Sequence, residues 1–208
     1  MFIDVEFQVT TNHLHQTLPT FYKQWSISVN IMPIGILTGE NEWGNILRVG
    51  LGGDREEYGD RTPAIWFTPS TTKMSIYSAI NGDSEYFIET DPIPINAWAW
   101  VEMSQVRQPD GVYQFTIRMA GAIIHQIINT DPREFSDVKI YTSDNYWPAA
   151  NAKIANLTIK TFPDNINLLP TLTPTLSAAT STTIDFSIAT VESPHIITSG
   201  KQVYNQTG

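Results

Sequence analysis

The chain is 208 residues long, has a hydrophobic content of 41% and contains no cysteine. This hydrophobic content is enough for a packed core, which excludes a disordered chain, and the missing thiols exclude disulfides, thiolate metal sites and cysteine nucleophiles. The 12 Lys and Arg residues against 21 Asp and Glu residues give a formal net charge of −9. Because this charge repels phosphate groups, nucleic acid and anionic membrane surfaces are unfavourable partners.

The composition favours strands over helices. The chain holds 25 Ile, 24 Thr and 10 Val residues, whose branched side chains fit a pleated sheet. No segment reaches the roughly 18 consecutive apolar residues of a membrane helix. Residues 1–6 place acids where a signal peptide carries bases, so no signal peptide is visible in this chain. We expect an all-β protein without membrane insertion.

Short alternating segments follow one another along residues 1–160. Residues 1–10 alternate, with Val5, Phe7 and Val9 on one side, and predict one half-buried strand. After a polar stretch, further strands are predicted at 25–31, 45–51, 64–67, 74–80, 85–89, 98–107, 112–120, 123–128, 138–142 and 152–160. This regular spacing is typical of a sandwich or barrel. We expect most of the strand tryptophans to be core residues: Trp25, Trp66, Trp98 and Trp100.

The composition changes after residue 162. Residues 170–208 contain 14 Ser or Thr residues and only three charged side chains, and they begin with a Pro-Thr-rich stretch. Within them Ile184, Phe186 and Ile188 alternate with smaller or polar residues, as in a strand. We therefore predict a domain at 1–162 and, at 163–208, a linker with a strand-like C-terminal extension. The extension has two possible docking sites, its own sandwich or a neighbouring protomer.

Four segments resemble a known superfamily. Residues 98–127 form a predicted three-stranded meander that opens with Trp98 and turns at Gly111 and Gly121. This meander resembles that of concanavalin A-like jelly rolls, which include laminin G-like, pentraxin-like and lectin-like domains. Residues 152–159 resemble the closing strand of laminin G-like domains. Residues 138–150 and 58–67 are similar to segments of extracellular animal-type domains of this superfamily. The resemblance implies a concanavalin A-like antiparallel β-sandwich, or jelly roll, in an extracellular setting.

Catalytic patterns are weak. Glycoside hydrolysis needs two carboxylates that face one sugar bond. Acids two residues apart on one strand occur only as Asp4 with Glu6 and as Glu89 with Asp91, and Pro92 interrupts the second pair. None of the four histidines accompanies a recognisable nucleophile motif. We expect the protein not to be an enzyme.

Two segments carry potential metal ligands. His13 and His15 supply only two imidazoles, which is too few for a zinc site. The acidic loop at 52–60 offers oxygen ligands that suit calcium, namely Asp54, Glu57 and Asp60. The alternative is a solvated loop in which arginines neutralise the acids. Calcium is therefore the one candidate cofactor that the sequence indicates.

Two loops, 81–86 and 143–148, combine polar and aromatic side chains, and residues 54–61 are a third candidate contact loop. Sugar recognition needs aromatic faces for stacking and planar polar groups for hydroxyls. The candidate ligand-binding residues are Asp60, Arg61, Asn81, Asp83, Asp144, Asn145, Tyr146 and Trp147. The structural alternative is that Trp147 closes one end of the sandwich and that Asn81 belongs to a hairpin turn.

These observations favour a non-catalytic extracellular recognition or adhesion module. Its expected partner is a glycan or the extracellular matrix. The alternative is a self-assembling structural subunit, a homo-oligomer in which the C-terminal strand pairs with a neighbouring protomer.

Overall fold

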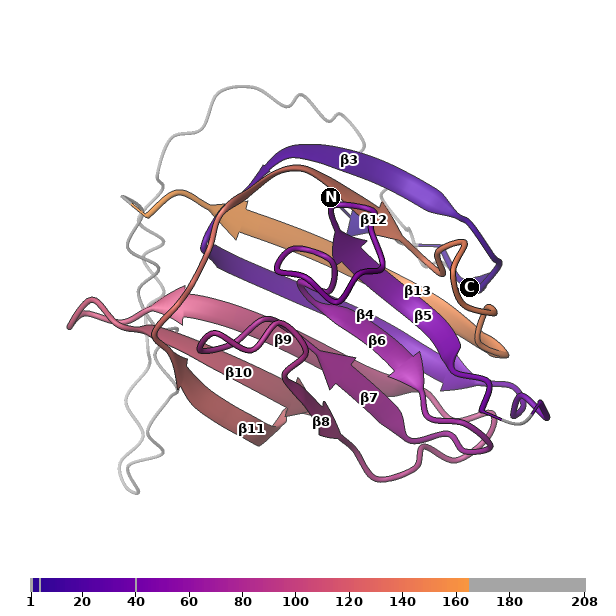
Figure 1. The fold of residues 1–208 in the computed structure, drawn as a ribbon. Coiled ribbons are helices and arrows are strands. Elements are labelled where there is room, and N and C mark those ends of the chain that lie inside the picture. The colour runs from indigo at the N-terminus through magenta and orange to yellow at the C-terminus, as the bar shows by residue number, and fades with distance from the viewer. Residues whose placement is uncertain (1, 4, 40, 165–208) are drawn as a thin grey trace, which may run out of the picture. The chain divides into compact units, whose positions relative to one another are not determined.

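The computed structural model describes residues 2–3, 5–39 and 41–164, which form two antiparallel sheets and no helix (Figure 1). The seven-stranded sheet has the order β1-β13-β4-β9-β10-β11, and β2 also pairs with β13. Its strands are β1 (Phe2–Ile3), β2 (Phe7–Gln8), β4 (Gln24–Pro33), β9 (Ala99–Arg107), β10 (Tyr113–Met119), β11 (Ala122–Asn129) and β13 (Ala152–Phe162). The six-stranded sheet follows the order of its members: β3 (Leu14–Phe21), β12 (Phe135–Tyr141), β5 (Gly44–Gly50), β6 (Ala64–Phe67), β7 (Met74–Tyr77) and β8 (Phe87–Glu89).

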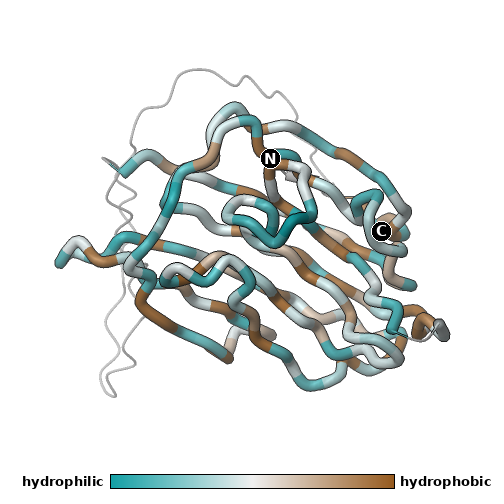
Figure 2. Tube along the Cα trace, viewed as in Figure 1, coloured by the Kyte–Doolittle hydropathy of each residue, from teal (hydrophilic) through white to brown (hydrophobic). Residues whose placement is uncertain are grey.

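The core lies between the two sheets. On β4 the side chains of Ile27, Val29 and Ile31 are fully buried, while the residues between them are half-buried. This period of two follows the pleat, because successive side chains point to opposite faces of a sheet. Figure 2 shows the hydrophobic positions along the strands and the hydrophilic residues in the loop that follows β5. The all-β prediction is confirmed.

The N-terminal segment differs from its prediction. Residues 1–10 do not form one strand: β1 and β2 are separate two-residue strands, and both pair with β13. Between them Val5 is 68% exposed, so the predicted apolar side of the strand is broken there. The following polar stretch, in which we predicted no strand, contains β3, which pairs with β12 at one edge of its sheet.

The tryptophan prediction was wrong for Trp98 and Trp100, which are 43% and 36% exposed. Trp100 is opposite Asn30 of β4, on the face of the sheet that points away from the core. Trp25 is a core residue, whereas Trp66 is buried outside the core cluster.

All described residues fall in the first of two units of the chain, Met1–Leu169, and the last strand ends at Phe162. The second unit, Pro170–Gly208, lies outside the described residues, as does the predicted strand around Phe186. The boundary at 162 stays a prediction. In the part that the structure describes, no helix is long and apolar enough to cross a bilayer.

Candidate functional site

The outer face of the six-stranded sheet carries two aromatic side chains on neighbouring strands. Trp66 of β6 and Tyr77 of β7 alternate with the core residues Ile65 and Ile76, so they point away from the core. Their rings meet edge to face, with centroids 5.1 Å apart at 84°. An aromatic surface is thereby fixed on rigid strands.

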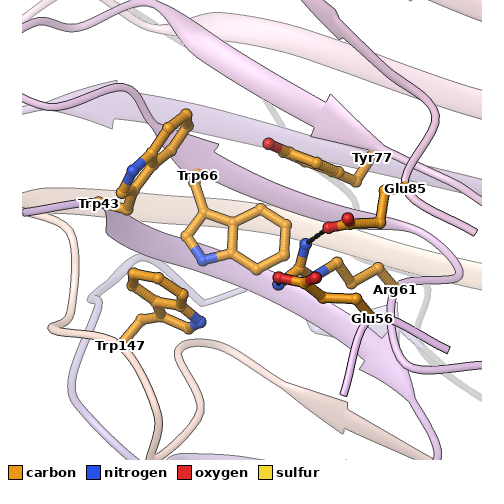
Figure 3. Close-up of a pocket in the computed structure, with 7 residues that line it drawn as sticks. All are labelled: Trp43, Glu56, Arg61, Trp66, Tyr77, Glu85 and Trp147. Atoms are coloured by element: carbon orange, nitrogen blue, oxygen red, sulfur yellow. Dashed lines mark hydrogen bonds and ion pairs between the residues drawn. The ribbon is translucent and has the colours of Figure 1, made fainter. Parts of the chain in front are cut away.

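Four loops enclose this surface in a pocket of about 190 Å³ (Figure 3). Trp43 comes directly before β5, and Trp147 comes from the segment between β12 and β13. The complete lining is Trp43, Glu56, Arg61, Trp66, Tyr77, Glu85 and Trp147. Trp43 and Trp147 lie at one end of the pocket, the charged groups lie at the other, and Trp66 lies between them.

Arg61 forms the charged end of the pocket. Its guanidinium carbon lies 5.3 Å from the ring centroids of both Trp66 and Tyr77, within the range of cation–π attraction. The same group pairs with Glu85, with Glu56 at 3.7 Å and with Asp54 at 3.4 Å. Burial raises the pKa of Glu85 above its usual value, and the nearby Arg61 opposes this shift. One guanidinium is therefore shared by three carboxylates.

Buried donors at this face have no hydrogen-bond partner among the described residues. They are Trp66 Nε1, Arg61 Nε and Asn45 Nδ2, in residues that are 3%, 6% and 0% exposed. Trp66 and Arg61 line the pocket, and Asn45 is the register partner of Trp66 on β5. Because a buried donor without an acceptor costs about 1–3 kcal/mol, this arrangement favours a ligand that supplies acceptors.

A buried arginine of β5 holds the surrounding loops together. Arg48 is 1% exposed, and its Nη1 lies 2.6 Å from Asp144 Oδ2. Its Nη2 lies 3.2 Å from Asp54 Oδ1 and also donates to the carbonyl of Gly53, while its Nε donates to the carbonyl of Asp60 at 2.9 Å. The loop after β5 and the segment after β12 are thus fixed to one charged group.

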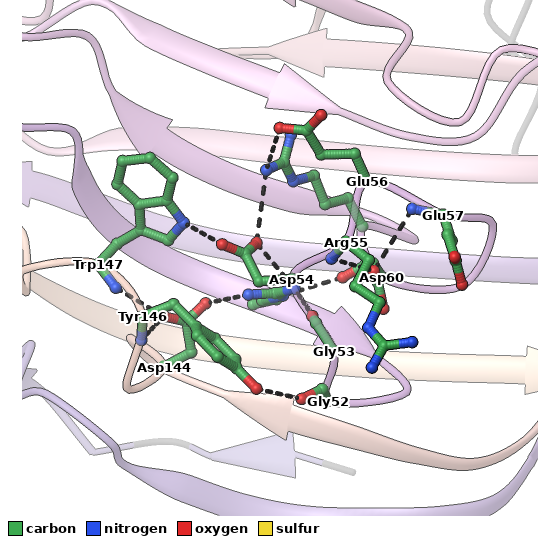
Figure 4. A network of polar contacts seen from close by, with 12 residues as sticks. Gly52, Gly53, Asp54, Arg55, Glu56, Glu57, Asp60, Asp144, Tyr146 and Trp147 are labelled. Atoms are coloured by element: carbon green, nitrogen blue, oxygen red, sulfur yellow. Dashed lines mark hydrogen bonds and ion pairs between the residues drawn. The ribbon is translucent and has the colours of Figure 1, made fainter.

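The same network orients Trp147 (Figure 4). Asp144 Oδ1 accepts the backbone N–H groups of Tyr146 at 2.8 Å and Trp147 at 3.1 Å. The indole Nε1 of Trp147 then donates to Asp54 Oδ2 at 3.1 Å. Asp54 therefore contacts both ends of the pocket, Trp147 at one and Arg61 at the other.

Close approach of the backbone shapes the loop after β5. A Cβ atom at Gly50 would lie 2.4 Å from the carbonyl oxygen of Asp60, which is a forbidden distance. The loop therefore folds back directly over the end of β5. This return brings Arg61 to the outer face of the sheet.

The three loops that carry the predicted ligand-binding residues meet around this pocket, although the residues take different positions. Arg61 and Trp147 line it. Asp60 and Asp144 are 6% and 1% exposed and bind backbone N–H groups, so they support the loops. Asn145 is exposed.

The remaining predicted ligand-binding residues lie outside the pocket lining. Asn81 accepts from the backbone N–H of Thr130 and donates to the carbonyl of Ile128. Asp83 accepts from the backbone N–H of Glu85 and so helps to place it. Tyr146 lies beneath the guanidinium of Arg48 and donates its hydroxyl to the carbonyl of Gly52.

The predicted calcium ligands share a separate depression beside the pocket. Asp54, Glu57 and Asp60 line it. The carboxylate of Asp54 meets two arginines, and Asp60 Oδ2 accepts the backbone N–H groups of Arg55 and Glu57. Among the described residues, no group of three His, Asp or Glu side chains is placed to hold a metal ion.

Other sequence candidates form structural contacts. Glu89 pairs with Lys73 at 2.7 Å, and Glu6 pairs with Lys153 at 2.7 Å. His13 and His15 lie with ring centroids 4.2 Å apart, and His15 Nε2 lies 2.7 Å from Thr142 Oγ1. None of these residues lines the pocket.

Sequence reasoning missed most of the pocket lining. Five of the seven lining residues were not among the candidate ligand-binding residues, namely Trp43, Glu56, Trp66, Tyr77 and Glu85. The segment 64–67 is apolar on both faces, so alternation gives no sign that Trp66 faces outward. A signal was available in Tyr77, a large polar aromatic next to the core residue Ile76 on a short strand.

No family model and no curated protein matches this chain. A heptameric SAP-like pentraxin from Limulus polyphemus is similar in structure, with 13% identity, a TM-score of 0.51 and 75% of each chain covered. An endo-beta-1,4-glucuronan lyase from Trichoderma reesei has 11% identity and a TM-score of 0.46 over 76% of this chain and 79% of its own. The exoplasmic/lumenal domain of VIP36 has 12% identity and a TM-score of 0.43 over 81% and 86%. The chain has a concanavalin A-like jelly-roll fold, as the sequence resemblance predicts.

Proposed function

We propose that this concanavalin A-like sandwich is a non-catalytic glycan-binding module, and that its sugar site is the pocket between Trp43, Trp147 and Arg61. One observation carries the proposal: aromatic side chains surround a pocket in which the buried donors of Trp66 and Arg61 lack acceptors. Such a site combines apolar faces with a few fixed polar groups, as small-molecule sites do.

The chemistry of a pyranose ring suits this lining. One ring face consists of C–H groups that stack on an indole, and the rim of the ring carries hydroxyls that both donate and accept. Trp43 and Trp147 offer the stacking surfaces at one end, where the indole nitrogen of Trp66 also lies, and Arg61 lies at the other end (Figure 3). The supporting network around Arg48 fixes these groups before a ligand arrives, which reduces the entropy cost of binding.

A glycan array followed by calorimetry tests the proposal. We expect wild-type protein to bind at least one glycan, and Trp147→Ala to lose at least about tenfold in affinity, because stacking contributes roughly 1.5 kcal/mol beyond buried area. Trp98→Ala is the matched control, since Trp98 is an exposed tryptophan outside the pocket. Silence of folded wild-type protein across the array contradicts the proposal.

The non-catalytic part of the proposal rests on the position of the acids. Glu56 and Glu85 both pair with Arg61 at one end of the pocket, whereas hydrolysis needs two carboxylates on either side of the scissile bond. We expect the bound glycan to stay intact during prolonged incubation, as followed by mass spectrometry. Cleavage that Glu85→Gln abolishes would assign an enzymatic function instead.

Calcium at Asp54, Glu57 and Asp60 remains a separate proposal. The oxygens of Asp54 and Asp60 already have protein partners, so calcium binding there would displace Arg48 or backbone N–H groups. We therefore expect EDTA to leave glycan affinity unchanged within about twofold, as calorimetry of the same sample before and after chelation measures. A large loss that added calcium restores would assign a calcium-dependent site.

The proposed setting is extracellular, with matrix or cell-surface glycans as partners. It is supported by the sequence resemblance of residues 138–150 and 58–67 to extracellular domains of the superfamily. Detection of the natural full-length protein in the medium of its source cells tests this setting, and exclusive retention inside the cells contradicts it.

Self-assembly is a second proposal, and one edge strand favours it. β11 ends the seven-stranded sheet, its eight residues carry no Asp, Glu, Lys or Arg, and Ile123, Ile124 and Ile128 are 48%, 43% and 38% exposed. Uncharged apolar edges pair readily with another strand. The C-terminal segment around Phe186, which we predicted as a partner strand, lies outside the described residues.

Sedimentation analysis of the full chain tests self-assembly. We expect an oligomer that Ile124→Lys dissociates, because a lysine at an edge opposes strand pairing. Truncation after Phe162 separates the two sources of assembly: loss of the oligomer assigns the tail, and its persistence assigns β11 alone. A wild-type monomer at high concentration contradicts the proposal.

A further inference from the structure

We infer that the pocket takes a single uncharged pyranose ring and discriminates against acidic sugars. The inference rests on the proposed glycan-binding function and adds the chemical class of the ligand. It follows from the volume of the pocket, from its charges and from the kind of polar group left unpartnered.

The volume limits the ligand to about one ring. The pocket holds about 190 Å³. Sites for drug-sized ligands typically have roughly 300–1,000 Å³. The Trp43 and Trp147 side chains close one end, and Arg61 with its carboxylates closes the other (Figure 3). A terminal sugar fits this shape better than the interior of a long polysaccharide.

The charges oppose an acidic sugar. Arg61 is the one cation in the lining, and it already pairs with Glu56, Glu85 and Asp54. A uronate or sialate carboxylate would therefore enter beside carboxylates without finding an unpaired cation. Like charges at this separation disfavour one another.

Neutral hydroxyls suit both ends of the pocket. A hydroxyl beside Arg61 can accept from Arg61 Nε and donate to a carboxylate of Glu56 or Glu85, and a second hydroxyl can accept from Trp66 Nε1 on the side of Trp147. The pocket thus combines donors and acceptors in the way that a neutral sugar needs.

The test uses matched sugars that differ only in charge. For the gluco, galacto and manno series, calorimetry with full-length protein compares the methyl glycoside with its uronic acid. We expect the neutral member of at least one series to bind at least about tenfold more tightly than its uronic acid. Trp66→Phe keeps the ring but removes the donor, and should weaken the neutral sugar about fivefold, the effect of one lost hydrogen bond.

Glu56→Gln tests whether the carboxylates of the pocket cause the discrimination against the acidic sugar. Its side chain is 57% exposed, so the variant should fold, which urea unfolding verifies. Removing one carboxylate should narrow the preference for neutral over uronic sugar by up to about fivefold, the effect of a surface charge pair. Trp98→Ala serves as the control that changes neither affinity nor preference.

The outcomes separate this inference from the proposed function. Tighter binding of a uronate overturns the inference and leaves glycan binding intact. Equal affinity of the neutral sugar and its uronic acid also overturns it. Absence of binding to every sugar by folded protein overturns the proposed function and the inference together.

Discussion

Arg48 is the residue on which the loops of the site depend. Its guanidinium is 1% exposed and contacts Asp144, Asp54 and the carbonyls of Gly53 and Asp60. Replacing it by methionine keeps much of the volume but leaves a buried carboxylate without its charge partner. Removing one member of a buried ion pair typically costs about 3–5 kcal/mol.

We therefore expect Arg48→Met to lower the free energy of unfolding by about 3–5 kcal/mol, as urea denaturation measures. Arg118→Met is the control. Arg118 lies 3.9 Å from Glu102 with its side chain 39% exposed, so its loss should cost less than about 1 kcal/mol. Equal effects of the two variants would contradict the role assigned to the buried network.

On strand β6, one residue contributes to stability and its neighbour contributes to binding. Ile65 packs in the core and Trp66 lines the pocket, although they are neighbours in the chain. Ile65→Ala should lower the free energy of unfolding by about 2–5 kcal/mol and leave the sugar affinity of folded protein unchanged. Trp66→Phe should show the reverse, with a small stability change and a weaker affinity. Parallel urea titrations and calorimetry measure both, and a joint loss of both properties in each variant would contradict the two-faced strand.

The same strand shows why the fold was easier to predict than the site. Long strands with one exposed face, such as β4 and β9, alternate clearly, and their segments were predicted within about two residues at most ends. β6 is buried on both faces, so its sequence does not indicate a direction for Trp66. β3 was missed because its half-exposed edge position needs few apolar residues.

The site depends on contacts that sequence distance conceals. The three candidate contact loops were identifiable, and they do meet around the pocket, but whether a residue lines the pocket or supports a loop depends on its burial. Asp144 is 96 positions from its partner Arg48, and Asp54 is 93 positions from Trp147. Because of these long-range contacts, Asp144 and Asp54 hold the loops in place and do not line the pocket. Trp43 follows Asn41 and Glu42 in the sequence but was not among the candidates, and only the fold brings it to the pocket.

For the whole molecule, two half-buried histidines couple stability to pH. His15 of β3 lies beside His13 and Thr142, and burial, with the nearby His13, lowers the pKa of His15 below its usual 6.5. His125 of β11 lies 2.9 Å from the hydroxyl of Tyr86, between the edge strands of the two sheets, and burial also lowers its pKa. Protonation of these two histidines therefore affects the stability of both sheets in the same direction.

The sign of the effect follows from the direction of both pKa shifts. As pH decreases, these histidines bind protons at a higher pH in the unfolded chain than in the folded protein. The free energy of unfolding should therefore be maintained above pH 6.5 and should fall as pH decreases below it. Urea midpoints at pH 7.5 and about pH 5.5 measure this loss. A combined His15→Gln and His125→Gln variant should show a smaller loss than wild-type protein. Glu85, whose pKa is raised, contributes with the opposite sign, but it is present in both proteins and cancels in the comparison. An identical loss in both proteins would assign the pH dependence to other groups.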